Sequence, residues 1–207
     1  MKNLLLDYII NNIEKQYNYD DVKLKEIRYG LESLYLSIFK LLIIIIISIF
    51  IHTTNYLCLL FLTYGILRLT GFGLHTKNSI ECWIFSITMF TLFPMLIKCL
   101  NINNYFYYIG SIILLILIII YAPADTEKRP LIHKKKRLIY KIITSLITIV
   151  YISIIIICKN IIIKKLLFFS ILLEVLLILP ISYKLLGLKY NNYLLYIRKE
   201  DRNEISS

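Results

Sequence analysis

The chain has 207 residues, of which 58% are hydrophobic, and 24 Lys and Arg against 13 Asp and Glu give it a net charge of +11. Soluble domains contain roughly 45–50% apolar residues, and the excess here lies in long continuous blocks, which excludes an ordinary soluble domain and argues against an alternating transmembrane β-barrel. Because basic loops are the usual device that orients membrane helices, the positive charge indicates a lipid bilayer as partner and no nucleic acid.

Residues 2–16 predict an amphipathic helix, since Leu5, Ile9 and Ile13 share one face with Leu6 and Ile10 while charged residues lie elsewhere. We expect this helix to rest on the membrane surface. Asp20 or Asp21 can cap a second helix that begins near residue 22 and continues into the first membrane span.

The apolar blocks predict an all-α fold, a polytopic transmembrane helical bundle of about six spans. One or two of these spans are expected to be only partly inserted, and the short second span is the main candidate. The domain organisation that follows is an N-terminal amphipathic interfacial region over 1–33, a transmembrane domain over 34–182 and a polar tail over 183–207. The six spans are expected at roughly 34–51, 55–69, 83–98, 104–121, 139–158 and 161–182.

Lys and Arg decide the orientation of the spans. Six spans with an internal N-terminus put nearly all the basic clusters on the cytoplasmic side, so both termini are expected there. Glu174 lies in the last apolar block. An acid at membrane depth is either a functional group or half of a buried hydrogen bond or ion pair that orients the helix. The basic clusters lie in residues 1–33, 68–77, 122–141 and 184–202.

The stretch 68–83 is the most polar and Gly-rich part of the apolar region, and His75 precedes Cys82 by seven residues within it. Cys82 opens an apolar helix, where the positive end of the helix dipole favours a thiolate. A nearby imidazole can act as the base of that thiol. A His and a Cys this close also arise often by chance, so composition alone does not decide for catalysis.

Geometry constrains any His75–Cys82 pair. Seven residues of one straight helix rise by about 10 Å, whereas proton transfer needs contact at about 3 Å or one bridging water. The two side chains therefore cannot both lie on one uninterrupted helix and react together. We predict a break in the chain between them, with His75 on a loop or a separate short helix.

The stretch resembles the accessory gene regulator protein B (AgrB) family of bacterial membrane endopeptidases. The family pattern has an Arg, a Gly pair, one further residue, a His, and a Cys seven residues after it. Arg68, Gly73, His75 and Cys82 match this pattern, while Phe72 replaces the first Gly of the pair. Two other departures are Leu69, where a second basic residue is common, and Thr76, where Ala is common. Residues 28–32 and 122–130 also resemble family segments.

The resemblance implies a cysteine endopeptidase of the bacterial cytoplasmic membrane that uses no metal and no cofactor. Its substrate would be a quorum-sensing pheromone precursor peptide, from which it removes the acidic C-terminal tail before the rest closes into a thiolactone or lactone ring. Cys82 would be the nucleophile and His75 the general base and then acid, with the site on the cytoplasmic side. The oligomeric state stays open, with a homodimer as the form that the resemblance suggests.

Several supporting roles stay open at this point. Glu81, Asn78 and Asp125 are candidates for a third group that orients His75. Arg68 either holds substrate or anchors the second span, and Gly73 is a further candidate for a supporting role. The basic loop 128–137, which begins with Lys128 and Arg129, either attracts an acidic precursor tail or only sets topology.

Two functions from other classes compete with the peptidase. A small transporter or exporter without catalytic residues would line its path with Glu174 and the pair Lys164 and Lys165. A membrane scaffold without activity would tolerate substitution of both His75 and Cys82.

Overall fold

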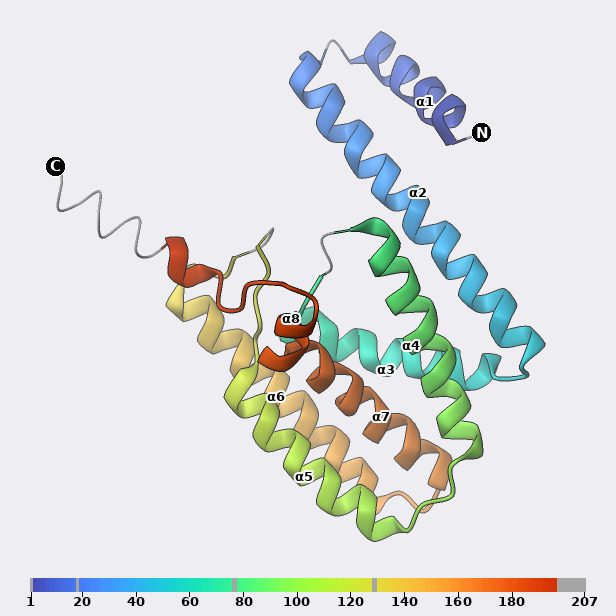
Figure 1. Ribbon diagram of the computed structural model, residues 1–207, viewed down its shortest axis with the longest axis vertical. Coiled ribbons are helices and arrows are strands. Elements are labelled where there is room, and N and C mark those ends of the chain that lie inside the picture. Colours follow the sequence, from blue (N-terminus) through green and yellow to red (C-terminus); the bar gives the residue numbers. More distant parts are fainter. Residues whose placement is uncertain (1, 18, 76–77, 128–129, 197–207) are drawn as a thin grey trace, which may run out of the picture. The chain divides into compact units, whose positions relative to one another are not determined.

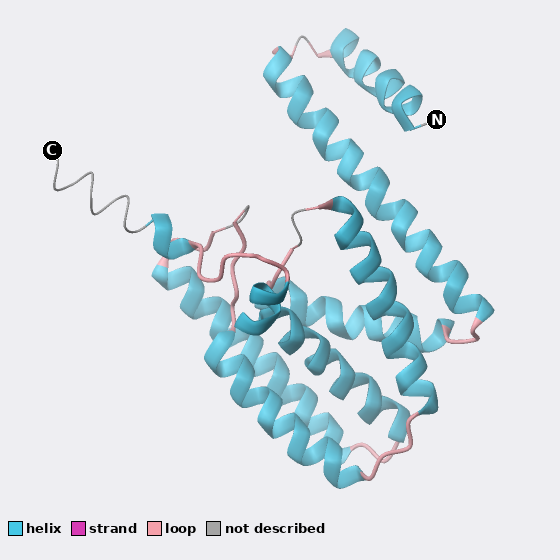
Figure 2. Cartoon of the chain, in the orientation of Figure 1, coloured by secondary structure: helices cyan, strands magenta, loops and turns pink. Residues whose placement is uncertain are grey.

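The computed structural model describes residues 2–17, 19–75, 78–127 and 130–196, and helices account for most of them (Figure 2). No strand occurs among these residues, which confirms the all-α expectation. The chain divides into two compact units after Phe50. The helices are α1 (Lys2–Gln16), α2 (Asp21–Phe50), α3 (Thr54–Gly71), α4 (Ser79–Cys99), α5 (Asn104–Tyr121), α6 (Lys134–Ile157), α7 (Ile161–Ile178) and α8 (Pro180–Leu185).

The first unit is a pair of helices. The α1 helix packs on α2 and buries Leu6 and Ile10 of the predicted apolar face, while Leu5 of the same face is exposed. An exposed ion pair of 2.6 Å joins Asp7 Oδ1 to Arg28 Nη2, a contact of the kind that contributes little to stability. The α2 helix is continuous over 30 residues, so the predicted second helix does run into the first apolar block.

The second unit is a bundle built around α7. This helix, which is mostly apolar on every face, is buried along most of its length and packs against α3, α4, α5 and α6. Outward-facing Ile and Leu side chains remain exposed on α5 and α6, for example Ile112, Ile116 and Leu146. Such a surface suits a hydrocarbon solvent rather than water.

Four of the described helices are long and apolar enough to cross a membrane: α2, α4 from Ile80, α5 and α6. The chain is therefore an all-α membrane protein, but the expected count of about six spans is not confirmed. The α3 and α7 helices have 18 residues each. Lys164, Lys165 and Glu174 interrupt the apolar sequence of α7, and Arg68 interrupts that of α3.

One end of the second unit gathers segments that are distant in sequence. Residues 72–75, 122–127 and 130–133 and the α8 helix all lie there (Figure 1). The other end carries the short turns at 100–103 and 158–160. The residues that the sequence singles out as chemically active belong to the first of these ends.

Candidate functional site

The end of α3 leads into a backbone that few residue types adopt. Phe72 has φ 60° and ψ −112°, and Gly73 follows with φ 95°. A positive φ is ordinary for Gly and strained for a residue with a Cβ. Phe72 stands where the family pattern has the first Gly of its pair, so the local geometry explains why Gly suits this position.

Three backbone hydrogen bonds hold the segment that precedes His75. The Gly73 N–H donates to the Ala124 carbonyl at 2.8 Å, and the Ala124 N–H donates to the Gly71 carbonyl at 3.1 Å. On the other side, the Leu74 N–H donates to the Leu177 carbonyl at 2.9 Å. The segment 122–126 and the end of α7 therefore fix the backbone immediately before His75.

The structure places His75 and Cys82 on different elements. His75 is exposed and lies outside any helix, whereas Cys82 is partly buried in the first turn of α4, where its N–H donates to the Asn78 carbonyl at 3.1 Å. No single helix includes both residues, because α3 ends at Gly71 and α4 begins at Ser79. The predicted break in the chain is confirmed.

The first turn of α4 carries one acid beside the thiol. The Glu81 Oε1 accepts a hydrogen bond of 2.7 Å from the Asn78 side-chain amide, and both residues are exposed. The helix dipole at this turn favours negative charge, whether on the Glu81 carboxylate or on a Cys82 thiolate. The helix dipole therefore stabilises negative charge at this turn. The Glu81 carboxylate, one residue from Cys82, already places one such charge there.

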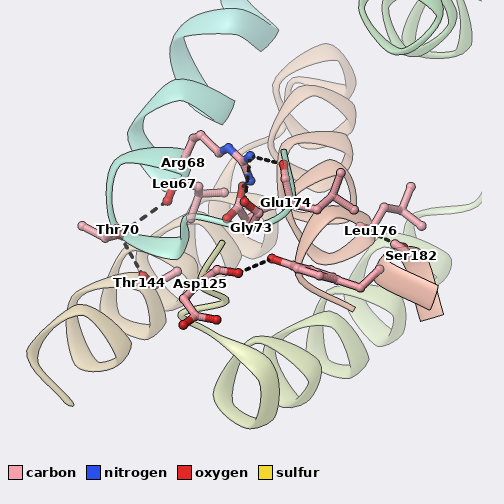
Figure 3. A network of polar contacts seen from close by, with 11 residues as sticks. Leu67, Arg68, Thr70, Gly73, Asp125, Thr144, Glu174, Leu176 and Ser182 are labelled. Carbon is pink, nitrogen blue, oxygen red and sulfur yellow. Dashed lines mark hydrogen bonds and ion pairs between the residues drawn. The ribbon is translucent and has the colours of Figure 1, made fainter. Parts of the chain in front are cut away.

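Arg68, on the last turns of α3, reaches over the same segment (Figure 3). Its Nη2 donates to the carbonyls of Gly73 at 3.3 Å and Leu74 at 2.9 Å. Its Nη1 lies 3.9 Å from Oε2 of Glu174 on α7, whose side chain is fully buried. One cation thus connects the two residues before His75 to the acid that the sequence marked as unusual.

The two glycines of this stretch leave room for the two members of that ion pair. A Cβ at Gly71 would overlap Oε1 of Glu174, and a Cβ at Gly73 would overlap Nη1 of Arg68. The Gly71-Phe72-Gly73 sequence is therefore explained by close packing around the ion pair, in addition to the positive φ at Gly73.

Asp125 serves the C-terminal segment in this structure. Its Oδ1 and Oδ2 accept from the backbone N–H groups of Asn192 at 2.9 Å and Tyr193 at 2.7 Å. Its carbonyl accepts from the Tyr183 hydroxyl at 2.9 Å. Burial raises the pKa of the Asp125 carboxyl, and the hydrogen bonds and the Arg137 charge offset part of that rise.

The remaining candidates stand as follows. Lys128 and Arg129 lie outside the described residues. Among the described residues, no three His, Cys, Asp or Glu side chains converge so as to hold a metal ion. The pairing of Arg68 with Glu174 was not predicted: the sequence marked each residue separately, and only their opposite charge in apolar surroundings gave a signal.

Comparison with known proteins matches the chain to the family described as Accessory gene regulator B, over residues 6–178. An AgrB-like protein of Clostridium acetobutylicum is 34% identical over 189 residues, covering 91% of this chain and 90% of the relative. The accessory gene regulator protein B of Staphylococcus epidermidis is 33% identical over 174 residues, covering 83% and 87%. An AgrB-like protein of Listeria welshimeri is 30% identical, covering 81% and 82%. No solved structure matches the chain.

Proposed function

Since the chain belongs to the accessory gene regulator B family, which ties it to the processing of quorum-sensing pheromones, we propose that it is a membrane cysteine endopeptidase. It removes the C-terminal tail of a pheromone precursor peptide and promotes closure of the remaining segment into a thiolactone or lactone. The single observation that carries this proposal is the position of His75 directly after a tethered segment, with Cys82 on the first turn of the next helix.

The chemistry follows from these two groups. The Cys82 thiolate attacks the carbonyl carbon of the scissile peptide bond, and a C–S bond forms while the carbonyl oxygen takes the negative charge. The C–N bond then breaks, and His75 gives a proton to the leaving amine. The acyl group remains on Cys82 as a thioester.

Ring closure is a second acyl transfer. A thiol of the bound precursor attacks the thioester carbonyl, a new C–S bond forms, and the bond to Cys82 breaks. His75 takes the proton from the attacking thiol, and Cys82 leaves as thiolate. A Ser hydroxyl in place of the precursor thiol gives a lactone. Since water competes for the same thioester, a partly dry site favours ring closure over hydrolysis.

The membrane setting completes the proposal. The basic segments around 68–77 and 134–141 support a site on the cytoplasmic side of the bacterial cytoplasmic membrane, with both chain termini inside. The basic run that starts α6, with Lys128 and Arg129 before it, attracts an acidic precursor tail. Self-association into a homodimer is part of the same proposal, and crosslinking in membranes tests it.

The test is mass spectrometry of the full-length protein co-expressed with a precursor peptide that carries a central Cys and an acidic C-terminal tail. We expect an acyl adduct on Cys82, and loss of precursor cleavage when Cys82 or His75 is replaced by Ala. Replacement of Cys58, Cys99 and Cys158 provides the matched control, since these cysteines should be dispensable. Full cleavage by the Cys82→Ala variant would refute the proposal.

A further inference from the structure

Glu174 has no part in the proposed chemistry, yet it is the most buried carboxylate near the site. We propose that Glu174 is a positioning residue for His75 and acts through Arg68, whose guanidinium holds the backbone of the two residues before the histidine. This inference rests on the proposed function, because it gives His75 a task that depends on its position.

The first step of the argument concerns the charge of Glu174. Its side chain is fully buried in α7, and its carboxylate oxygens accept no hydrogen bond from the described residues. A buried carboxylate without compensation is strongly disfavoured, so its partner is held tightly. Arg68, at 3.9 Å, is the cation that forms an ion pair with it. The carboxylate thereby draws the guanidinium toward α7.

The second step concerns what the guanidinium does once it is placed. Nη2 donates to two successive carbonyls, those of Gly73 and Leu74, while Nη1 lies toward Glu174 (Figure 3). The guanidinium is planar and rigid, so fixing one nitrogen orients the other. Leu74 directly precedes His75 in the chain. A movement of Arg68, which donates to the Leu74 carbonyl, would therefore shift the backbone of His75.

The third step concerns the support from α7 itself. Leu177 lies three residues after Glu174, on the same side of the helix, and its carbonyl accepts from the Leu74 N–H at 2.9 Å. The α7 helix therefore contacts the histidine segment twice, once through backbone and once through Glu174 and Arg68. Gly71 and Gly73 let both contacts approach closely, because a Cβ at either position would overlap a member of the ion pair.

This arrangement distinguishes positioning from the two other roles open to these residues. If Arg68 held substrate, its removal would weaken binding of the precursor. If the ion pair only stabilised the bundle, its loss would affect Cys82 no more than the loss of another buried polar contact on α7. Lys164 offers that comparison, because it is buried on the same helix and its Nζ donates to the Tyr108 hydroxyl at 2.8 Å, at the other end of the bundle.

The experiment measures the reactivity of Cys82 without any precursor. The full-length protein, with Cys58, Cys99 and Cys158 replaced by Ser, is purified and treated with iodoacetamide at pH 7. The thiolate is the reacting form, so the alkylation rate reports how well His75 supports it. We compare Glu174→Gln, Glu174→Asp, Arg68→Lys and His75→Ala, with Lys164→Met as the matched control.

We expect Glu174→Gln and Arg68→Lys to lower the alkylation rate on the order of 10-fold, toward the level of His75→Ala, with partial recovery in Glu174→Asp. In a His75→Ala background, Glu174→Gln should change nothing further, because both act on the same group. Lys164→Met should lower the thermal midpoint and leave the rate unchanged. In precursor cleavage, Glu174→Gln should lower kcat with little change in KM.

The outcomes separate this inference from the proposed function. If His75→Ala leaves the rate unchanged, the His75–Cys82 chemistry itself is wrong. If His75→Ala slows alkylation while Glu174→Gln and Arg68→Lys do not, the peptidase stands and the positioning role is overturned. A rise in KM on Arg68→Lys would instead assign Arg68 to substrate. If Glu174→Gln fails to fold, Arg68→Lys and Glu174→Asp still decide, because both keep the two opposite charges.

Discussion

The two ends of the second unit are connected in different ways. At the end with α8, backbone groups of residues far apart in sequence bond to one another: Gly73 to Ala124, and Leu74 to Leu177. At the other end the turns are capped locally, since the Asn103 and Asn160 side chains accept from N–H groups two residues ahead. Its long-range contacts come from side chains such as Lys98 and Lys164.

The difference indicates where the protein needs a defined backbone. A chain reversal between two helices requires only that the helix ends be capped, and a flexible Lys side chain is enough to add a contact. A reacting group requires a position held within a fraction of an ångström, which rigid elements and fixed backbone provide. The predictions below ask whether the two ends respond differently to comparable substitutions, beginning with the largest effect.

Replacement of Gly73 by Ala should have the largest effect. The new Cβ would overlap Arg68 Nη1, lie 2.9 Å from the Leu177 carbonyl oxygen, and occupy a φ of 95°. We expect a loss of about 1–3 kcal/mol in stability from the strained backbone and a fall in precursor cleavage on the order of 100-fold from displacement of the histidine segment. Cleavage assays and thermal unfolding in detergent measure the two effects.

Gly187 provides the control for that substitution. It also has a positive φ, 61°, but no atom beyond Gly187 and its two chain neighbours lies within 4 Å of the position that a Cβ would take. Gly187→Ala should therefore cost stability through strain alone and leave cleavage unchanged. Equal loss of cleavage in both variants would mean that strain, and not the contact with Arg68 and Leu177, decides the outcome.

Asp125→Ala should have the next largest effect, on the C-terminal segment. It leaves the N–H groups of Asn192 and Tyr193 without their acceptor, which favours release of residues 183–196. We expect trypsin to cleave after Lys189 on the order of 10-fold faster. Cleavage of precursor should fall less, because the Ala124 carbonyl still accepts from Gly73. Glu127→Ala removes an exposed carboxylate nearby and should leave the trypsin rate unaltered.

Phe72 allows a smaller test of the strained backbone. Ala is ordinarily more stable than Gly at the same position by roughly 0.5–1 kcal/mol. At a φ of 60° the order should reverse, so that Phe72→Gly unfolds at a higher temperature than Phe72→Ala. Both variants lose the edge-to-face contact with Tyr140, whose ring centroid lies 5.0 Å away, so that loss cancels in the comparison. The usual order would show that the positive φ is not present in the folded protein.

These comparisons also show what the sequence could and could not predict. The helix over 2–16 and the breaks near 52, 101 and 159 follow from patterns of neighbouring residues, which is why they were predicted closely. The break between His75 and Cys82 was predicted because the geometry of one helix forbids contact across seven residues. The six-span count rested on the length of apolar blocks, and α3 and α7, which contain charged residues such as Arg68 and Glu174, are not among the four helices long and apolar enough to cross.

The contacts between distant segments were beyond the reach of the sequence. Glu174 was recognised as an acid in apolar surroundings, but nothing in a single sequence indicates that Arg68, over a hundred residues earlier, is the partner. Asp125 was a candidate to orient His75, and its two carboxylate oxygens accept from the C-terminal segment. Such pairings depend on how helices cross and which loops meet, so they become visible only in three dimensions.

The smallest effect is expected at the locally capped end. Asn160→Ala removes the side-chain acceptor of the Ile162 N–H, a bond of 2.9 Å, and should cost about 1 kcal/mol. Asn103→Ala removes a longer bond of 3.3 Å to Tyr105 and should cost less. Thermal unfolding measures both, and precursor cleavage should be unchanged in each. If either variant lost cleavage without losing stability, a local helix cap would be needed for activity. That result would contradict the expectation that only the end with α8 positions the reacting groups.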